Sequence, residues 1–242
     1  MTGVDVRRDA HGVAELVLDR PEARNAISTA QATAIGDACA DLAADRAVRA
    51  IVVSSADPRA FCVGADLKER RAFSDDDLRA QRPIMRRAFG GVLDLPVPTI
   101  AAVHGYALGG GFELALACDL VVADETAVLG LPEVSVGLVP GGGGTQLLTR
   151  RIGQSRAADL IFTGRHVTAP EAERLGIVDR RVPAGQAREV ALELAASIAS
   201  HSPVGLRQAK IAIRAALGVR LEDGLEVEDA AWRATAFSAD RR

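Results

Sequence analysis

The chain has 242 residues, 48% of them hydrophobic and 25% charged, which suits one large domain or a domain with a small appendage. Its formal net charge of −3 provides no broad attraction to nucleic acid or to an anionic membrane surface. Cys39, Cys62 and Cys118 are odd in number, widely spaced and without a CxxC pair, which favours free thiols in a reducing compartment.

Neither the start of the chain nor its longest uncharged stretch predicts membrane targeting. No apolar run follows the charges of MTGVDVRRDAHG, so this opening is not typical of a signal peptide. The 18 uncharged residues at 95–112 approach the length of a membrane span, but they include two prolines, a histidine and four glycines. We therefore expect a soluble cytoplasmic protein.

Strand and helix patterns alternate through the first three quarters of the chain. In chain order they predict strand Val13–Leu18, helix 28–47, strand Ala50–Ser55, a charged helical region up to residue 93, strand 99–105, a short helix ending at Cys118, and strand 119–123. This alternation predicts an α/β fold.

The later part of the sequence is mainly helical. A helix is expected over 149–162, and a second one within TAPEAERLG, where Thr168 and Glu171 have the spacing of a capping box. A short strand in IVDRRV follows. Successive helices are expected from Gly185 onward, one of them starting at Ser202-Pro203, so that the chain ends in a helical appendage.

Several familiar cofactor motifs are absent from the sequence. Neither GxxxxGK[ST] nor GxGxxG occurs, and PGGGGTQ at 140–146 lacks the lysine and the context of a phosphate loop. The segment EVSVG has glutamate where a nucleophile elbow has its first glycine, and the four histidines lack metal-ligand spacing. We expect neither a metal nor a nucleotide cofactor.

The stretch AVHGYALGGGFELALACD, residues 102–119, places three glycines before an apolar segment that contains Glu113. Glycines at a helix start can leave N–H donors free at the positive end of the helix dipole, which suits a negative oxygen. If that oxygen belongs to the enolate of a thioester, the segment forms an oxyanion hole. The alternative is close packing of a helix and a strand at a tight turn.

Glu113 and Glu133 are the candidate acid–base pair. Burying Glu113 between Phe112 and Leu114 is costly without a purpose. Two carboxylates that converge on one pocket repel each other, so that one tends to keep its proton and the pair provides an acid and a base. The alternative for Glu133 is a solvated glutamate after Pro132.

The loop FCVGADLK, residues 61–68, could bring a further backbone N–H, from Gly64 or Ala65, to the same oxygen. Arg59 and Lys68 could meet the phosphate groups of a large anionic ligand, or they could be scattered surface cations. Cys62 has no obvious histidine partner, so we expect a small buried hydrophobe there.

Four segments together resemble the enoyl-CoA hydratase/isomerase, or crotonase, superfamily: RPEARNAI, FCVGADLKER, PTIAAVHGYALGGGFELALACD and LPEVSVGLVPGGGGTQLLTRRIG. The similarity extends from about Val13 to the end of the chain and is closest to the methylglutaconyl-CoA hydratase branch. It implies a spiral of ββα units over residues 1–184. It also implies a C-terminal helical region, 185–242, that forms homotrimers or homohexamers, here without the final helix usual in the family.

The resemblance also implies roles for particular residues. The N–H groups of Ala65 and Gly110 would form the oxyanion hole, Glu113 and Glu133 would hold the attacking water, and CoA contacts fall on Ala23, Arg24, Ala60 and Lys68. The implied reaction is the syn addition of water to a trans-2-enoyl-CoA, as in fatty acid β-oxidation. Coenzyme A is part of that substrate, so no separate cofactor is implied.

Two other reactions and one binding function remain as alternatives. The reactions are Δ3,Δ2-enoyl-CoA isomerisation and hydration of a methylglutaconyl-CoA-type substrate. The free carboxylate of the latter substrate would need a basic group in the acyl pocket. The candidates for that group are Arg70, Arg71, Arg82, Arg86 and Arg87. The remote alternative is RNA binding, since some members of that branch have been described as binding AU-rich RNA. Arg207, Lys210 and Arg214 form a basic stripe, but we expect it to be a solvated face, and with 3% aromatic residues nucleic acid is not an expected partner.

Overall fold

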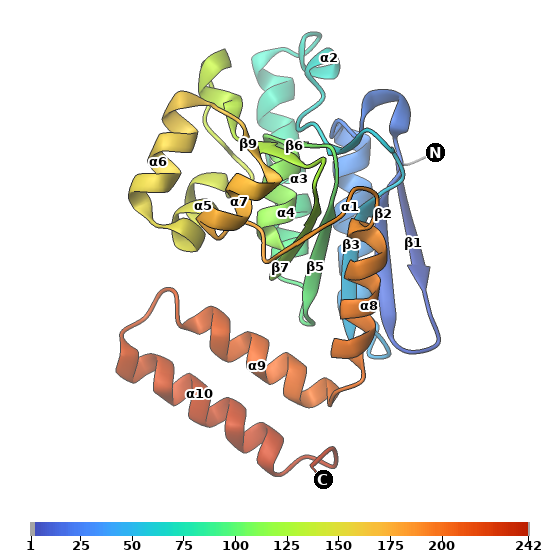
Figure 1. Ribbon diagram of the computed structural model, residues 1–242, viewed down its shortest axis with the longest axis vertical. Helices are drawn as coiled ribbons and strands as arrows, with labels where there is room; N and C mark the ends of the chain where they lie inside the picture. The colour runs from blue at the N-terminus through green and yellow to red at the C-terminus, as the bar shows by residue number, and fades with distance from the viewer. Residues whose placement is uncertain (1–2, 242) are drawn as a thin grey trace.

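The larger of two β-sheets forms the centre of the protein (Figure 1). The computed structural model describes residues 3–241. Within them, the larger sheet has the strand order β1-β2-β3-β5-β7-β10, in which only β1 and β2 pair antiparallel. Its strands are β1 (Val4–Arg8), β2 (Val13–Leu18), β3 (Ala50–Ser55), β5 (Thr99–Val103), β7 (Leu120–Asp124) and β10 (Arg180–Val182).

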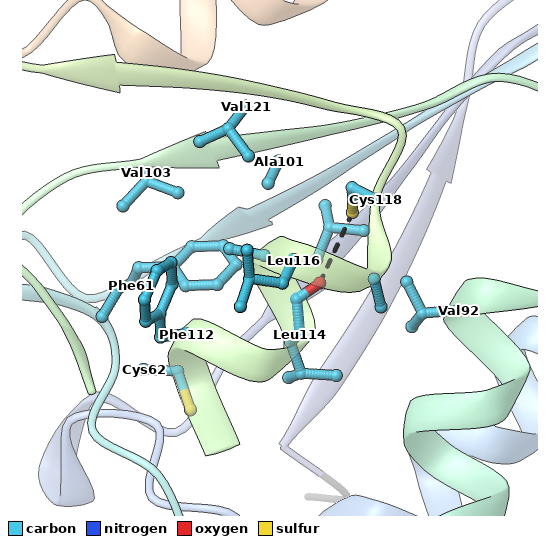
Figure 2. Close-up of a cluster of buried hydrophobic side chains, with 14 of the residues drawn as sticks. Phe61, Cys62, Val92, Ala101, Val103, Phe112, Leu114, Leu116, Cys118 and Val121 are labelled. Carbon is cyan, nitrogen blue, oxygen red and sulfur yellow. Dashed lines mark hydrogen bonds between the residues drawn. The ribbon is translucent and has the colours of Figure 1, made fainter. Parts of the chain in front are cut away.

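Helices cover both faces of this sheet, which explains why β2 and β3 are buried at every residue. On one face, α8 (Ala187–Ala199) packs its alanines against side chains such as Ile100 and Val122. On the other face, α1 (Thr29–Ala44), α3 (Asp75–Leu93) and α4 (Gly110–Ala117) contribute to the main core. Phe112 and Leu116 of α4 lie beside Val103 and Val121 in that core (Figure 2).

A smaller sheet, in the order β4-β6-β8-β9, lies beyond the carboxyl ends of the central strands. It consists of β4 (Ala60–Cys62), β6 (Tyr106–Leu108), β8 (Val128–Gly130) and β9 (Val167–Thr168). A central strand, a short strand and then one or more helices follow one another three times: β3-β4-α2-α3, β5-β6-α4 and β7-β8-η2-α5. The predicted spiral of ββα units is therefore confirmed.

The remaining connecting elements differ from the sequence expectation in two places. They are η1 (Pro21–Ala23), α2 (Leu67–Arg70), η2 (Pro132–Val136), α5 (Gly144–Ile152), α6 (Gln154–Thr163) and α7 (Ala169–Leu175). The single helix predicted over 149–162 is two helices, because Gly153 adopts φ 84° and ψ 158° between them. The predicted capping box is also wrong: the Thr168 side chain makes no cap bond, and Glu171 instead accepts a hydrogen bond from Arg165 at 2.8 Å.

The last two helices, α9 (Pro203–Ala215) and α10 (Leu221–Ala236), pack against each other and extend away from the central sheet (Figure 1). As predicted, α9 starts at Ser202-Pro203, and the Ser202 hydroxyl accepts a hydrogen bond from the Gly205 N–H. The exposed apolar side chains of these helices and of the residues that follow each of them include Ile211, Ile213, Leu217, Leu221, Leu225, Trp232 and Phe237. Such a surface suits an oligomer contact, and oligomerisation through residues 185–242 stays a prediction.

The basic stripe on α9 faces the protein, so the expectation of a solvated face is wrong. Lys210 is buried, and its Nζ donates to the Val97 carbonyl at 2.7 Å and pairs with Asp119 at 2.6 Å. Arg214 lies 3.6 Å from the same carboxylate, and Arg207 donates to the Val48 carbonyl. A buried ammonium group needs such partners, and the stripe is thereby engaged in anchoring α9.

No helix of the described chain, residues 3–241, combines the length and the apolar character needed to cross a membrane.

Candidate active site

A cavity of about 410 Å³ brings the four predicted catalytic positions together. Its walls come from α3, the start of α4, η2, and the loops that precede α2 and α5. The residues around it include Ala65, Gly110, Glu113 and Glu133. These positions come from separate segments of the sequence, and only the fold places them around one space.

The three glycines at the start of α4 serve different purposes. A Cβ atom at Gly111 would overlap the carbonyl oxygen of Cys62, so this glycine permits close packing of α4 on β4. Gly109 has φ 51°, in the region that favours glycine, and a Cβ there would lie 3.1 Å from Oε1 of Glu133. Gly111 therefore serves the close packing, whereas Gly109 lines the cavity beside Glu133, and the oxyanion hole stays a prediction.

The amides of Ala65 and Gly110 reach the cavity from two chain segments. Gly64, with φ 91°, allows their close approach, since a Cβ on it would lie only 3.2 Å from the Gly110 nitrogen and 2.9 Å from the Leu108 carbonyl oxygen. Within residues 3–241, no group accepts a hydrogen bond from either amide. Two free N–H donors at the wall of one cavity can bind one oxygen together.

Glu113 lies in the first turn of α4 and is only 3% exposed. Its Oε1 accepts hydrogen bonds from the N–H groups of Gly142 and Gly144, both at 2.7 Å. A Cβ atom at Gly142 or Gly144 would come within 2.8 or 2.9 Å of the Glu113 oxygens. Sequence reasoning missed these two partners, although the run of glycines in PGGGGTQ was the available signal.

Glu133, in η2, has a different environment from Glu113. Its Oε2 is buried, and no donor among the described residues reaches it. Burial, together with the negative charge of Glu113, raises the pKa of Glu133 to about 7. The expectation of a solvated glutamate as the alternative for this position is therefore wrong.

The pKa of Glu113 is also raised by burial, but several groups oppose that shift. The amides of Gly144 and Gly142 donate to the carboxylate, and the positive charge of Arg82 lowers the pKa further. Glu113 therefore has groups that stabilise its anion, whereas Glu133 has an unpartnered oxygen. This asymmetry favours an ionised Glu113 beside a protonated Glu133 near neutral pH.

Glu133 should make the stability of the fold depend on pH. Its pKa of about 7 in the folded protein exceeds the ordinary value of 4.5, so the folded state binds more protons between these pH values and loses stability as pH rises through 7. Glu133→Gln removes this loss. We expect thermal unfolding to show a higher Tm for the variant than for the wild type at pH 8, with a much smaller difference at pH 5.

The matched control for this experiment is Glu228→Gln, because Glu228 is an exposed glutamate on α10 without an ion pair among the described residues. Its Tm difference from the wild type should be small and similar at both pH values. An equal difference at pH 5 and pH 8 for Glu133→Gln would contradict the raised pKa.

A larger cavity, of about 1270 Å³, adjoins the first one and shares Ala65 with it. Three of the predicted CoA-contact positions line it: Ala23, Arg24 and Lys68. Ala60 lines neither cavity; it is fully buried in β4, where its carbonyl accepts a hydrogen bond from Ser55. Arg59 is likewise engaged elsewhere, with Asp57 and the Pro21 carbonyl.

Cys62 and possible metal ligands were the other candidates for reactive groups. Cys62 is fully buried, as expected, and burial raises the pKa of its thiol to about 12. Across residues 3–241, no group of three or more His, Cys, Asp and Glu side chains could hold a metal ion.

Comparison with known sequences identifies the family to which this site belongs. The family model described as Enoyl-CoA hydratase/isomerase matches residues 8–242. The chain belongs to the enoyl-CoA hydratase/isomerase family. Probable enoyl-CoA hydratase 2, mitochondrial, of Arabidopsis thaliana is 41% identical over 230 residues, which cover 95% of this chain and 76% of that protein.

Two further similarities cover nearly the whole chain. Methylglutaconyl-CoA hydratase, mitochondrial, of Homo sapiens is 39% identical over 240 residues, which are 98% of this chain and 71% of that protein. The crystal structure of an enoyl-CoA hydratase from Bacillus anthracis superimposes with a TM-score of 0.96 and 38% identity, covering 99% and 93% of the two chains. The resemblance and the fold class expected of this enoyl-CoA hydratase/isomerase family member are thereby confirmed.

Proposed function

We propose that this protein is an enoyl-CoA hydratase, which adds water syn across the C2=C3 double bond of a trans-2-enoyl-CoA to give a 3-hydroxyacyl-CoA. The observation that carries the proposal is the pair of carboxylates, Glu113 and Glu133, on one cavity, of which only Glu113 accepts hydrogen bonds from backbone amides of the neighbouring loop. Such a pair supplies a base and an acid at the same pH, and addition of water needs both.

Each part of the substrate has a matching region of the protein. The CoA portion would occupy the larger cavity, where Arg24 and Lys68 provide positive charge for phosphate groups. The acyl chain would enter the smaller cavity with the thioester oxygen between the N–H groups of Ala65 and Gly110. Because CoA is part of the substrate, the proposed reaction requires no separate cofactor.

The chemistry follows from the two protonation states. The N–H groups of Gly142 and Gly144 both donate to Oε1 of Glu113, and Oε2 would bind the water. Ionised Glu113 takes a proton from that water as its oxygen bonds to C3. The two amides stabilise the resulting enolate, and Glu133 donates its proton to C2, which restores the thioester carbonyl. A proton transfer from Glu113 to Glu133 through solvent returns the starting state.

The experiment that tests the proposal is incubation of the purified protein with crotonyl-CoA, followed by mass analysis of the product. We expect a product heavier by one water molecule, with the 3-hydroxy group and no free CoA. Incubation with a 3-enoyl-CoA tests the isomerase alternative, in which the mass does not change. Isomerisation without hydration of crotonyl-CoA would overturn the proposal in favour of the isomerase.

A specific observation favours a hydratase of acidic substrates as the second candidate. Of the five arginines considered from the sequence, Arg70 and Arg82 line the acyl cavity. Arg70 donates only its Nε–H, to Gln81, and neither arginine has a carboxylate of residues 3–241 within ion-pair distance. In the same assay, a higher kcat/KM for 3-methylglutaconyl-CoA than for crotonyl-CoA would favour this candidate.

The proposal also covers the oligomeric state and the question of RNA binding. The exposed apolar surface of α9 and α10 supports a homo-oligomer, trimeric or hexameric. The basic stripe on α9 contacts the protein itself, so it supports no role in RNA binding.

A further inference from the structure

Arg82 contacts the catalytic region through a single peptide group. The Nη1 atom of this α3 residue donates a hydrogen bond to the carbonyl oxygen of Gly141 at 2.8 Å. The same peptide unit carries the N–H of Gly142, which donates to Oε1 of Glu113 at 2.7 Å. Because a peptide unit is planar and rigid, one flat group links the guanidinium on one side to the buried carboxylate on the other.

We propose that Arg82 is a positioning residue that fixes the Gly141–Gly142 peptide against Glu113. The inference rests on the proposed function, since it assigns Arg82 a part in preparing the base. Arg82 acts on the reaction through the peptide and Glu113. The peptide dipole points its oxygen at the cation and its N–H at the anion, so both contacts favour the same orientation.

The loop needs such an external contact because its own sequence cannot hold it in place. Residues 141–144 are all glycine, which leaves this backbone freer than any other composition would. Side chains could not replace them, because a Cβ at Gly142 or Gly144 would meet the oxygens of Glu113. A Cβ at Gly141 would in turn lie 2.9 Å from Nη1 of Arg82. The fixing group must therefore come from another element, and Arg82 is placed to supply it.

Few charged groups face Glu113 across the elements packed around it. Glu133 faces it from η2 and repels its charge. Arg82 faces it from α3, and the positive charge of its guanidinium lowers the pKa of Glu113. The loop before α5 contributes the N–H group of Gly142, and the first residue of α5 contributes that of Gly144. Removing Arg82 thus removes one support of the ionised state and leaves burial and Glu133 to oppose it.

The test compares Arg82→Gln and Arg82→Lys with the wild type in the hydration of crotonyl-CoA between pH 5 and 9. For Arg82→Gln we expect kcat to fall about tenfold at pH 7, as for loss of one charge-assisted hydrogen bond. The fall of kcat on the acidic side of its pH profile should occur at higher pH than in the wild type, while KM changes little. Arg82→Lys should return that fall toward its wild-type position.

The matched control is Arg86→Gln, one turn further along α3, because Arg86 is exposed, lines neither cavity and has no ion pair with a described residue. Its pH profile should be that of the wild type. A fall of kcat on the acidic side that is not shifted in Arg82→Gln would overturn the inference. So would a rise in KM with unchanged kcat, which would assign Arg82 to substrate binding.

A second measurement separates this inference from the proposed function. In the Glu133→Gln background, the carboxyl group of Glu113 is titrated by ¹³C NMR with Arg82 present and with Arg82→Gln. The inference expects a higher pKa of Glu113 without Arg82, and an unchanged titration would overturn it. If the wild type hydrates no enoyl-CoA, the proposed function fails, and this titration still decides the role of Arg82.

Discussion

Glu113→Gln should lower kcat for the hydration of crotonyl-CoA by about 10²- to 10⁴-fold, as expected when a general base is removed. Glutamine keeps the shape of the side chain and can still accept the N–H bonds from Gly142 and Gly144, but it cannot take a proton from water. Because the larger cavity proposed for CoA is separate from this side chain, KM should change little. Steady-state kinetics with crotonyl-CoA measures both parameters.

Glu133→Gln should cause a loss of similar size for a different reason. The variant cannot deliver a proton to C2, whereas its amide fills the same space at the cavity wall. The exposed Glu228→Gln serves as the control and should keep wild-type kinetics. A near-normal kcat in Glu113→Gln or Glu133→Gln would refute the assignment of that residue.

Gly111→Ala should strongly destabilise the fold. The added Cβ would overlap the Cys62 carbonyl oxygen and lie 2.8 Å from the Cys62 Cβ, and a backbone carbonyl in β4 cannot turn aside like a flexible side chain. Overpacking of a core typically costs about 1–3 kcal/mol of the free energy of unfolding, and an overlap with backbone should reach at least the upper part of that range. Urea unfolding followed by circular dichroism measures the change.

Gly218→Ala is the matched control for this substitution. A Cβ at Gly218 would meet no atom within 4 Å, and its φ is not in the region that favours glycine. The free energy of unfolding of this variant should therefore stay close to that of the wild type. Equal stability of Gly111→Ala and Gly218→Ala would show that α4 and β4 are less closely packed than the structure indicates.

The central sheet was largely predictable because its strands are runs of apolar residues. Strands Val13–Leu18 and Ala50–Ser55 have the predicted bounds, since residues buried on both faces leave a continuous hydrophobic pattern. The smaller sheet was missed. Strands such as β4 and β6 have three residues each, too few for a periodic pattern, and they are defined by pairing with distant segments.

Predictions from the spacing of polar residues were less reliable where a residue distant in the sequence binds the same side chain. Thr168 and Glu171 have the spacing of a capping box, but Arg165 takes the carboxylate of Glu171. Lys210 has the spacing of a solvated stripe, but Asp119 and the Val97 carbonyl bind it in the interior. In both places, tertiary contacts outweigh the local pattern; a helix cap, for example, is worth only about 1 kcal/mol.

By itself, the sequence determined the chemical groups of the site: two glutamates, a glycine-rich helix start and a second loop with a free amide. Their convergence and their protonation were decided only by the tertiary structure. The pKa of a carboxylate depends on burial, on donors and on nearby charges, and for Glu113 these come from Gly142, Gly144, Arg82 and Glu133. None of these residues is its neighbour along the chain, so local sequence patterns could not reveal how the environments of the two glutamates differ.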